Sequence, residues 1–277
     1  MTARQALRDA ATELDRAGCP SPRVDAEHLL AHALGRSRTE LYLSLDDPLA
    51  EEAAARFRTL VARRSLREPL AYVLGEWGFR RLTLRIDRRV LIPRPETEVV
   101  VERCLELLAG LEDPDVLDVG VGSGAIALAI ADEHPSARVT AIDRSEDALE
   151  VARANLSATG LDGRVRLVDR DLAGGFGQSR FDLIVSNPPY VQESEIEDLE
   201  PEVRDWEPRE ALVGPGATES VARDAHEALK DGGWLVLEVA EARARDFAAA
   251  LSAIGYEAVT IDRDLAGRER IVSGRKG

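Results

Sequence analysis

The sequence contains few cysteines, few aromatic residues and no long hydrophobic run. Among its 277 residues are two cysteines, and aromatic residues make up only 4% of the chain. Cys19 and Cys104 are far apart and form neither a metal-ligand spacing nor a redox motif, so we expect a reducing, cytoplasmic compartment. No apolar run approaches the roughly 18 residues of a membrane span, and no hydrophobic stretch follows the charged amino terminus. We therefore expect neither a membrane span nor a secretory signal.

The charge is divided unevenly along the chain. Residues 1–90 hold 16 basic and 13 acidic side chains, whereas residues 91–277 hold 20 basic and 38 acidic ones. Proteins that bind nucleic acid usually gain affinity by neutralising phosphates, and the acidic part would repel them. We therefore predict no direct binding of nucleic acid.

The hydrophobic pattern divides the chain into three parts. Apolar residues recur at helical spacing in residues 1–75, which predicts a helical bundle, with Gly35 ending one helix and a Ser37–Glu40 capping box starting the next. Apolar and arginine residues alternate over 77–92, which predicts a β-hairpin within a linker of residues 76–94. Residues 95–277 alternate strands with helices.

This third part is typical of an α/β fold with a parallel sheet covered on both faces. The expected parallel strands are short, continuous apolar runs: Val116–Val119, Val139–Ile142, Val165–Val168, Leu183–Val185 and Leu235–Val239. Glu257–Ile261 and Arg270–Val272 are joined by a short turn-rich stretch, which predicts an antiparallel pair at one edge.

A glycine-rich loop follows the first of these strands and opens a helix. Gly120, Gly122 and Ala125 satisfy the dinucleotide pattern G-x-G-x-x-A, and Asp143 ends the second strand, where an acid would bind ribose hydroxyls. NAD and S-adenosylmethionine both fit this pattern, and a turn without ligand is the plainer alternative. The extra Gly124 and the preceding Asp118 favour the methyl donor, because a carboxylate could attract the ammonium of its amino-acid portion.

A second loop, Ser186-Asn187-Pro188-Pro189-Tyr190, follows the fourth strand. A planar amide or exocyclic amine is a poor nucleophile because its lone pair is delocalised. The Asn187 side-chain oxygen and the Pro188 carbonyl can accept hydrogen bonds from such an NH₂ and favour the positive charge that develops on it. Pro189 stiffens the loop, and Tyr190 can lie against a flat acceptor. Together the two loops argue against a dehydrogenase.

With these motifs the sequence resembles the class I S-adenosylmethionine-dependent methyltransferases. More closely, it resembles the PrmC/HemK family, the N5-glutamine methyltransferases of peptide chain release factors. The resemblance covers nearly the whole chain, and its matching stretches are Ser21 to Ala26, Pro69 to Gly75, Val90 to Glu98, Asp118 to Gly124, Asn187 to Tyr190, Glu207 to Arg209 and Gly267 to Arg270.

The resemblance implies a fold, a cofactor, a partner and a set of site residues. The fold is a seven-stranded Rossmann-like methyltransferase domain preceded by a helical bundle, which docks the substrate, and a β-hairpin linker. The implied cofactor is S-adenosylmethionine, and the implied partner is a class I release factor, methylated on the glutamine of its Gly-Gly-Gln loop. The implied cofactor contacts are Asp118, Gly120, Gly122, Gly124, Asp143, Asp171, Leu172 and Asn187, and the implied holders of the acceptor glutamine are Asn187, Pro188, Pro189 and Tyr190.

One stretch departs from the family pattern, and a rival substrate class uses the same chemistry. After Glu207-Pro208-Arg209 the family usually has a Gly-Gly-x-Asp-Gly-type turn, whereas this chain has Val213-Gly214-Pro215-Gly216-Ala217. The rival is an amino-methyltransferase of DNA adenine or ribosomal RNA. The acidic run from Glu193 to Asp205 argues against it, because a phosphodiester would be poorly placed there. An inactive binding protein that keeps the fold is a further alternative, which a turnover assay would distinguish.

His28 and His32 have the i, i+4 spacing that can bind a metal on a helix face. No third ligand lies near them in the sequence. We therefore expect a solvated or packed pair and no metal site.

Overall fold

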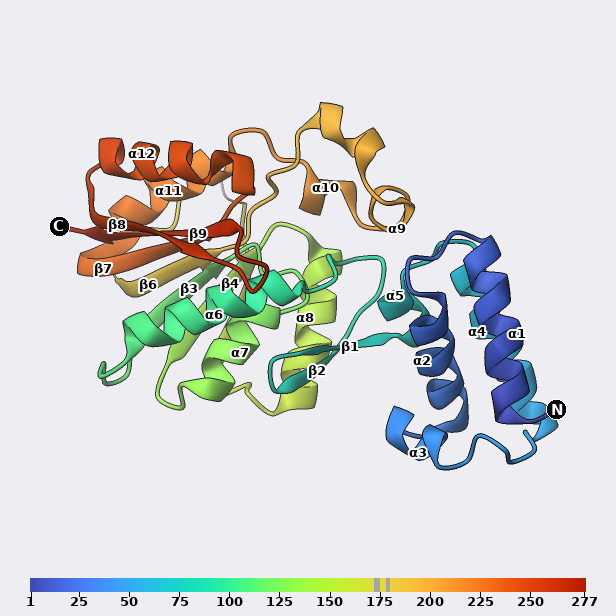
Figure 1. Cartoon of the computed structure of the whole chain (residues 1–277). Helices are drawn as coiled ribbons and strands as arrows, with labels where there is room; N and C mark the ends of the chain where they lie inside the picture. Colours follow the sequence, from blue (N-terminus) through green and yellow to red (C-terminus); the bar gives the residue numbers. More distant parts are fainter. Residues whose placement is uncertain (172–174, 178–179) are drawn as a thin grey trace. The chain divides into compact units, whose positions relative to one another are not determined.

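The computed structural model describes residues 1–171, 175–177 and 180–277 (Figure 1). The chain forms two compact units. The first comprises Met1–Glu76 together with Leu199–Trp206, and the second comprises Trp77–Asp198 together with Glu207–Gly277. Among the described residues, no helix is both long and apolar enough to cross a membrane.

The first unit is helical, as the sequence predicts. Its helices are α1 (Ala3–Arg16), α2 (Pro22–Leu34), α3 (Arg38–Tyr42), α4 (Glu51–Ser65), α5 (Leu70–Leu74) and α9 (Pro201–Arg204). Gly35 ends α2 in the left-handed conformation, and Ser37 and Glu40 form the predicted capping box at the start of α3. Leu14, Leu29 and Leu30 are fully buried in the core between these helices.

A buried ion-pair network joins segment 199–206 to the helices of the first unit. Arg64 of α4 donates to Asp25 (2.8 Å) and to Glu202 (2.8 Å), and Arg67 also donates to Glu202. The side chains of Arg64, Asp25 and Glu202 are only 5%, 8% and 14% exposed. Burial opposes the charge of Glu202, but the bonds from Arg67 and Arg64 outweigh it and hold the pKa of the carboxyl below its ordinary value.

The β-hairpin is shorter than the sequence predicts. Its strands are β1 (Glu76–Phe79) and β2 (Leu82–Arg85), and the apolar residues 90–92 lie outside any strand. The reason is a turn at Asp87, whose carbonyl accepts from the Val90 N–H (3.1 Å) and whose carboxylate accepts from the Arg89 N–H (3.0 Å). The alternation of apolar residues therefore continues past Arg85, where the hydrogen-bonded ladder of the hairpin ends.

The second unit contains the predicted sheet. Its seven strands are β3 (Asp115–Val119), β4 (Arg138–Asp143), β5 (Val165–Asp169), β6 (Phe181–Ser186), β7 (Leu229–Glu238), β8 (Tyr256–Arg263) and β9 (Glu269–Lys276), in the order β5-β4-β3-β6-β7-β9-β8. Strands β3 to β7 are parallel, and the antiparallel pair β8 and β9 lies at one edge, as predicted.

Helices cover both faces of this sheet (Figure 1). The first face carries α6 (Pro95–Leu108), α7 (Ala125–Glu133) and α8 (Glu146–Thr159), and the second carries α11 (Ala217–Ala228) and α12 (Ala244–Ile254). Because both faces are covered, the central strands are apolar throughout, and Leu183, Ile184 and Val185 of β6 are all fully buried. The remaining short elements of this unit are η2 (Glu193–Asp198), α10 (Arg209–Leu212) and η3 (Glu241–Arg243).

The strand order changes direction between β3 and β6. From β3 the chain continues to β4 and β5 on one side, whereas β6 and β7 lie on the other. Open α/β sheets bind ligands outside the carboxyl ends of the strands at such a switch point. The register pairs Val119 with Ser186, and Ser186 with Leu237. The residues that follow, Gly120, Asn187 and Glu238, therefore leave three adjacent strands at the same level.

Candidate active site

The glycine loop turns sharply out of β3 and into α7. Gly120, Gly122 and Gly124 have φ angles of 83°, 52° and 89°, which side chains other than glycine rarely adopt. Gly120 and Gly122 line a cavity. Apart from the glycine itself and its chain neighbours, no heavy atom of the described residues lies within 4 Å of the position that a Cβ would take on either one. A Cβ on Gly124 would instead stand 3.0 Å from Leu128 Cδ1, and Gly124 is not part of the lining. Gly124 thus serves the turn into α7.

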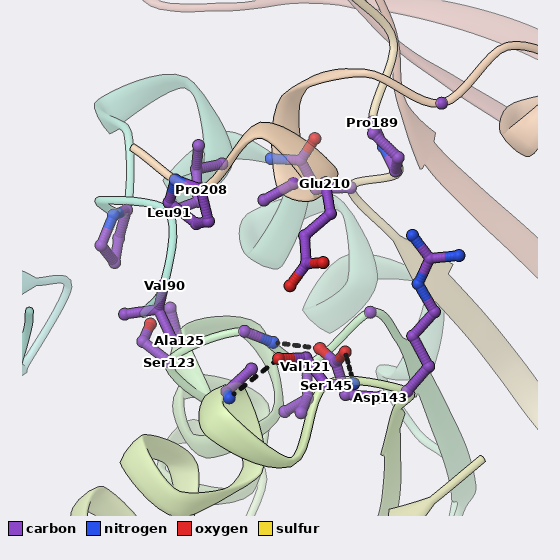
Figure 2. Close-up of a pocket in the computed structure, with 18 of the residues that line it drawn as sticks. Val90, Leu91, Val121, Ser123, Ala125, Asp143, Ser145, Pro189, Pro208 and Glu210 are labelled. Atoms are coloured by element: carbon purple, nitrogen blue, oxygen red, sulfur yellow. Dashed lines mark hydrogen bonds between the residues drawn. The ribbon is translucent and has the colours of Figure 1, made fainter. Parts of the chain in front are cut away.

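Asp143, at the end of β4, is held in place by two backbone donors. Its Oδ2 accepts from the Gly122 N–H (3.0 Å), and its Oδ1 accepts from the Ser145 N–H (3.0 Å) (Figure 2). Asp143 lines the same cavity as the glycine loop. The hydrogen bonds connect the loop to β4 and fix the carboxylate at the cavity wall.

Asp118, on β3, lies behind the glycine loop and outside the cavity lining. The residue is 1% exposed, and its Oδ2 accepts from the Ala127 N–H (3.0 Å). Its Oδ1 has no hydrogen-bond partner within the described parts of the chain. Burial, with a smaller contribution from the charge of Asp143, raises the pKa of Asp118 to about 8.

The cavity has a volume of about 430 Å³, a size typical of small-molecule sites. Five segments of the second unit form its wall: residues 89–97, the glycine loop, residues 143–148, the loop at Asn187 and Pro189, and residues 208–217. Figure 2 shows the Glu210 side chain extending into the cavity from α10. Glu210 is not predicted from the sequence, because its only signal there is its position directly after the matching Glu207-Pro208-Arg209 stretch.

The loop that follows β6 reaches this cavity with two of its predicted residues. Asn187 and Pro189 line it, whereas Pro188 and Tyr190 are not part of the lining. The Asn187 Nδ2 donates to the Thr97 hydroxyl (3.4 Å), and the Tyr190 hydroxyl donates to Glu238 (3.3 Å). Burial raises the pKa of Tyr190 to about 12, so this residue is a neutral hydrogen-bond donor at physiological pH.

Of the remaining predicted positions, those that the structure describes do not line the cavity. Asp171 is exposed and not part of the lining. Leu172 lies outside the described residues. His28 is half-buried and His32 is exposed, and the described residues contain no cluster of three or more His, Cys, Asp or Glu side chains that could hold a metal ion.

The segment that departs from the family pattern packs directly on the Asn187 loop. Val213 pairs with Val191 in an isolated parallel bridge, and the Val191 N–H donates to the Leu212 carbonyl (3.0 Å). A Cβ on Gly214 would stand 2.4 Å from Pro189 Cγ and 3.1 Å from the Pro189 carbonyl oxygen. Only glycine can approach Pro189 this closely.

Two further polar contacts support the cavity wall and were not predicted. The Asn155 side chain is buried and bonds to the Arg85 backbone and to the Ser123 carbonyl, which connects the hairpin to the glycine loop. Arg94 lines the cavity and donates to the buried carboxylate of Glu207 (2.5 Å). Neither pair is visible in a local pattern, because its members are far apart in the sequence.

Comparison with known proteins identifies both units. The family model described as PrmC N-terminal domain matches residues 5–75, and the model described as Methyltransferase small domain matches residues 98–201. A solved methyltransferase from Pyrococcus furiosus superposes with a TM-score of 0.50 at 20% identity, over 70% of this chain and 88% of its own, which supports the fold.

Curated relatives are similar over almost the whole sequence. A release factor glutamine methyltransferase of Rhodopirellula baltica is 45% identical and covers 94% of this chain and 91% of its own. One of Deinococcus radiodurans is 43% identical over 100% of this chain and 99% of its own. With this similarity spread over both units, the chain belongs to the release factor glutamine methyltransferase family.

Proposed function

We propose that this chain transfers a methyl group from S-adenosylmethionine to the side-chain amide nitrogen of the glutamine in the Gly-Gly-Gln loop of a class I release factor. The observation that carries the proposal is the register of β3, β6 and β7. It brings the glycine loop and the Asn187 loop together at one cavity, so a methyl donor and a planar amide can meet there. Its site of action would be the cytoplasm, where release factors work.

The residues around the cavity fit S-adenosylmethionine. The cavity has room for a small molecule, and the glycine backbone is open toward it. The Asp143 carboxylate is fixed at the wall, where it would hold the ribose hydroxyls. Asp118 lies behind the loop and outside the lining, so we assign it no direct contact with the donor, although its Oδ1 has no hydrogen-bond partner among the described residues. When bound, S-adenosylmethionine supplies an electrophilic methyl group on a sulfonium.

The Asn187 loop would prepare the acceptor nitrogen. The Asn187 Oδ1 and the Pro188 carbonyl accept hydrogen bonds from the glutamine NH₂, which holds the nitrogen in line and favours the positive charge that develops there. Tyr190 would lie against the planar amide. The alkylated nitrogen becomes acidic, so its proton can pass to water without a strong base in place.

A direct assay tests this function. The full-length protein is incubated with S-adenosylmethionine carrying a labelled methyl group, together with an intact class I release factor, DNA and ribosomal RNA. Mass spectrometry should find the mass of one methylene group added to the loop glutamine, and none when that glutamine is replaced by asparagine. Label in DNA or ribosomal RNA with an unmodified release factor would overturn the proposal.

We further propose that residues 1–75 dock the body of the release factor while its loop reaches Asn187. Two adjacent apolar side chains of the first unit, Tyr42 and Leu43, are 45% and 85% exposed. Residues 1–90 carry balanced charge, unlike the acidic remainder, so this part of the chain would not repel an acidic partner.

The docking proposal predicts a substrate-dependent effect of Leu43→Glu. This substitution should raise KM for the intact release factor and leave KM for a peptide of its loop unchanged, because only the intact factor could contact the first unit. The matched control is Leu265→Glu, at a residue that is 82% exposed on the second unit. Equal effects of the two substitutions, or none, would count against docking at Leu43.

A further inference from the structure

Glu238 is a buried carboxylate that binds two hydroxyl groups next to the Asn187 loop. It is the last residue of β7 and is 1% exposed. Its Oε2 accepts from the Thr97 hydroxyl (2.7 Å), and its Oε1 accepts from the Tyr190 hydroxyl (3.3 Å). Burial of a carboxylate is costly, and an apolar residue would suit the end of this strand better. Because Glu238 nevertheless occupies this position and contacts residues of the site, its burial requires a functional explanation.

The direction of these hydrogen bonds determines how the Asn187 amide is oriented. An ionised carboxylate can only accept, so the hydrogen of the Thr97 hydroxyl is committed to Glu238. The Thr97 oxygen is then left as an acceptor, and it accepts from the Asn187 Nδ2 (3.4 Å). With the NH₂ side of this amide facing Thr97, its Oδ1 is left to accept. The opposite orientation would present an NH₂ to the acceptor NH₂, and two donors cannot bond to each other.

We propose that Glu238 and Thr97 are positioning residues that orient the Asn187 amide oxygen toward the acceptor and hold Tyr190 beside it. This inference rests on the proposed function, because it assigns the two residues a role in that reaction. The register of β6 and β7 supports this proposal, because Leu237 pairs with Ser186. The next residues, Glu238 and Asn187, therefore leave neighbouring strands at the same level.

The chain of hydrogen bonds from Asn187 through Thr97 to Glu238 orients the Asn187 amide only when Glu238 is ionised. The groups that face its carboxyl are Thr97 and Glu96 from α6, Tyr190 from the loop and Arg270 from β9. Burial raises the pKa of Glu238, and the Thr97 hydrogen bond and the charge of Arg270 oppose that rise. A protonated Glu238 could donate to Thr97 and release the Asn187 amide. Methylation should therefore decline on the acid side at a higher pH than an ordinary glutamate would cause, and Glu238→Gln should remove this dependence.

The test is a double-mutant cycle on the full-length protein with the release factor as substrate. Thr97→Val keeps the shape but removes the hydroxyl, and it should lower kcat by about 10–100-fold, by analogy with the loss of residues that orient metal-ligating side chains. Thr97→Ser keeps the hydroxyl and should restore most of the rate. In an Asn187→Ala background Thr97→Val should cost less than about twofold, because the side chain it orients is gone. Cofactor affinity, measured by calorimetry, should be the same for the Val and Ser variants.

The outcomes separate this inference from the proposed function. If the wild-type protein does not methylate the release factor, the proposed function fails. If wild type is active and Thr97→Val costs as much in the Asn187→Ala background as alone, Thr97 does not act through Asn187 and the inference fails. It also fails if Thr97→Val only weakens cofactor binding with kcat unchanged at saturation, or if the acid limb of the pH profile persists in Glu238→Gln.

Discussion

At the scale of single residues, Asp118 links the glycine loop to the pH dependence of stability. Its carboxyl has a pKa of about 8 in the folded chain, above the ordinary value, because of its burial. The Asp118 carboxyl is therefore more protonated in the folded than in the unfolded state between about pH 4 and pH 8. Its contribution to the free energy of unfolding falls as the pH rises through that interval.

The raised pKa of Asp118 predicts a different pH dependence of stability for wild type and for Asp118→Asn. In urea titrations without cofactor, wild type should lose more stability than the variant between about pH 5 and pH 8, because the amide has no proton to lose. Glu207 and Glu238, whose pKa values burial also raises, are common to both proteins and cancel in the comparison. Parallel pH profiles for the two proteins would refute the assigned pKa.

The residues predicted from the sequence were those whose signal is local. Gly120, Gly122, Asp143, Asn187 and Pro189 stand in short motifs directly after apolar strands, and all line the cavity. Thr97, Glu210 and Glu238 were missed because their role comes from tertiary neighbours. For Glu238 one signal was available, since an acidic residue directly ending a buried apolar strand lies at the edge where α/β sheets place ligands.

At the scale of elements, the contact between Gly214 and Pro189 connects two loops of the site. A Cβ on Gly214 would fall 3.1 Å from a backbone oxygen as well as 2.4 Å from Pro189 Cγ, so the Asn187 loop would have to shift. A displacement of this kind, away from the reacting atoms, can cost about 100-fold in rate. We expect Gly214→Ala to lower kcat by about that factor with little change in the unfolding midpoint.

The control for this prediction is Gly78→Ala. Gly78 lies in β1 and does not adopt a positive φ. In the part of the chain that the structure describes, no heavy atom beyond its own chain neighbours lies within 4 Å of its Cβ position. Its substitution should leave kcat unchanged. Equal kcat values for the two alanine variants would show that the Asn187 loop tolerates the shift.

Element boundaries were less predictable than element types. The apolar run Leu235–Val239 predicted a strand that begins at Leu235, but β7 begins at Leu229. The register with β6 shifts between Phe181 and Leu183, so the ladder continues past the two glycines with an irregularity. Likewise the hairpin ends early at the Asp87 turn. For β7, tertiary pairing with β6 sets the boundary, whereas the hairpin is ended by a local turn.

At the scale of the whole molecule, the ion pairs of Arg64 hold a sequence-distant segment in the first unit. Arg64→Ala would leave Asp25 and Glu202 buried without their shared partner. Breaking a buried pair in this way costs about 3–5 kcal/mol, and chemical denaturation should measure a loss of that size. Arg58→Ala is the control: its pair with Glu51 is exposed (57% and 87%) and should cost about 0–1 kcal/mol. Similar losses for the two variants would mean that the Arg64 network contributes little.

The division of the chain into a helical unit and an α/β unit was readable from hydrophobic periodicity. The membership of Leu199–Trp206 in the first unit was not. Its marks in the sequence are acidic residues, which we interpreted as an argument against a nucleic-acid substrate. Glu202 instead lies against Arg64 and Arg67, and a contact across 138 positions leaves no local pattern.

This discontinuity has a consequence for synthesis on the ribosome. Domains generally fold as units in the order in which they emerge. The helices of the first unit emerge early, and Arg64 can then bond to Asp25 and to the Glu68 carbonyl. Its second carboxylate acceptor, Glu202, is translated 138 codons later, after the glycine loop and the Asn187 loop. The first unit therefore reaches its final stability only after most of the second has been translated, and the nascent chain carries an unfinished amino-terminal bundle until then.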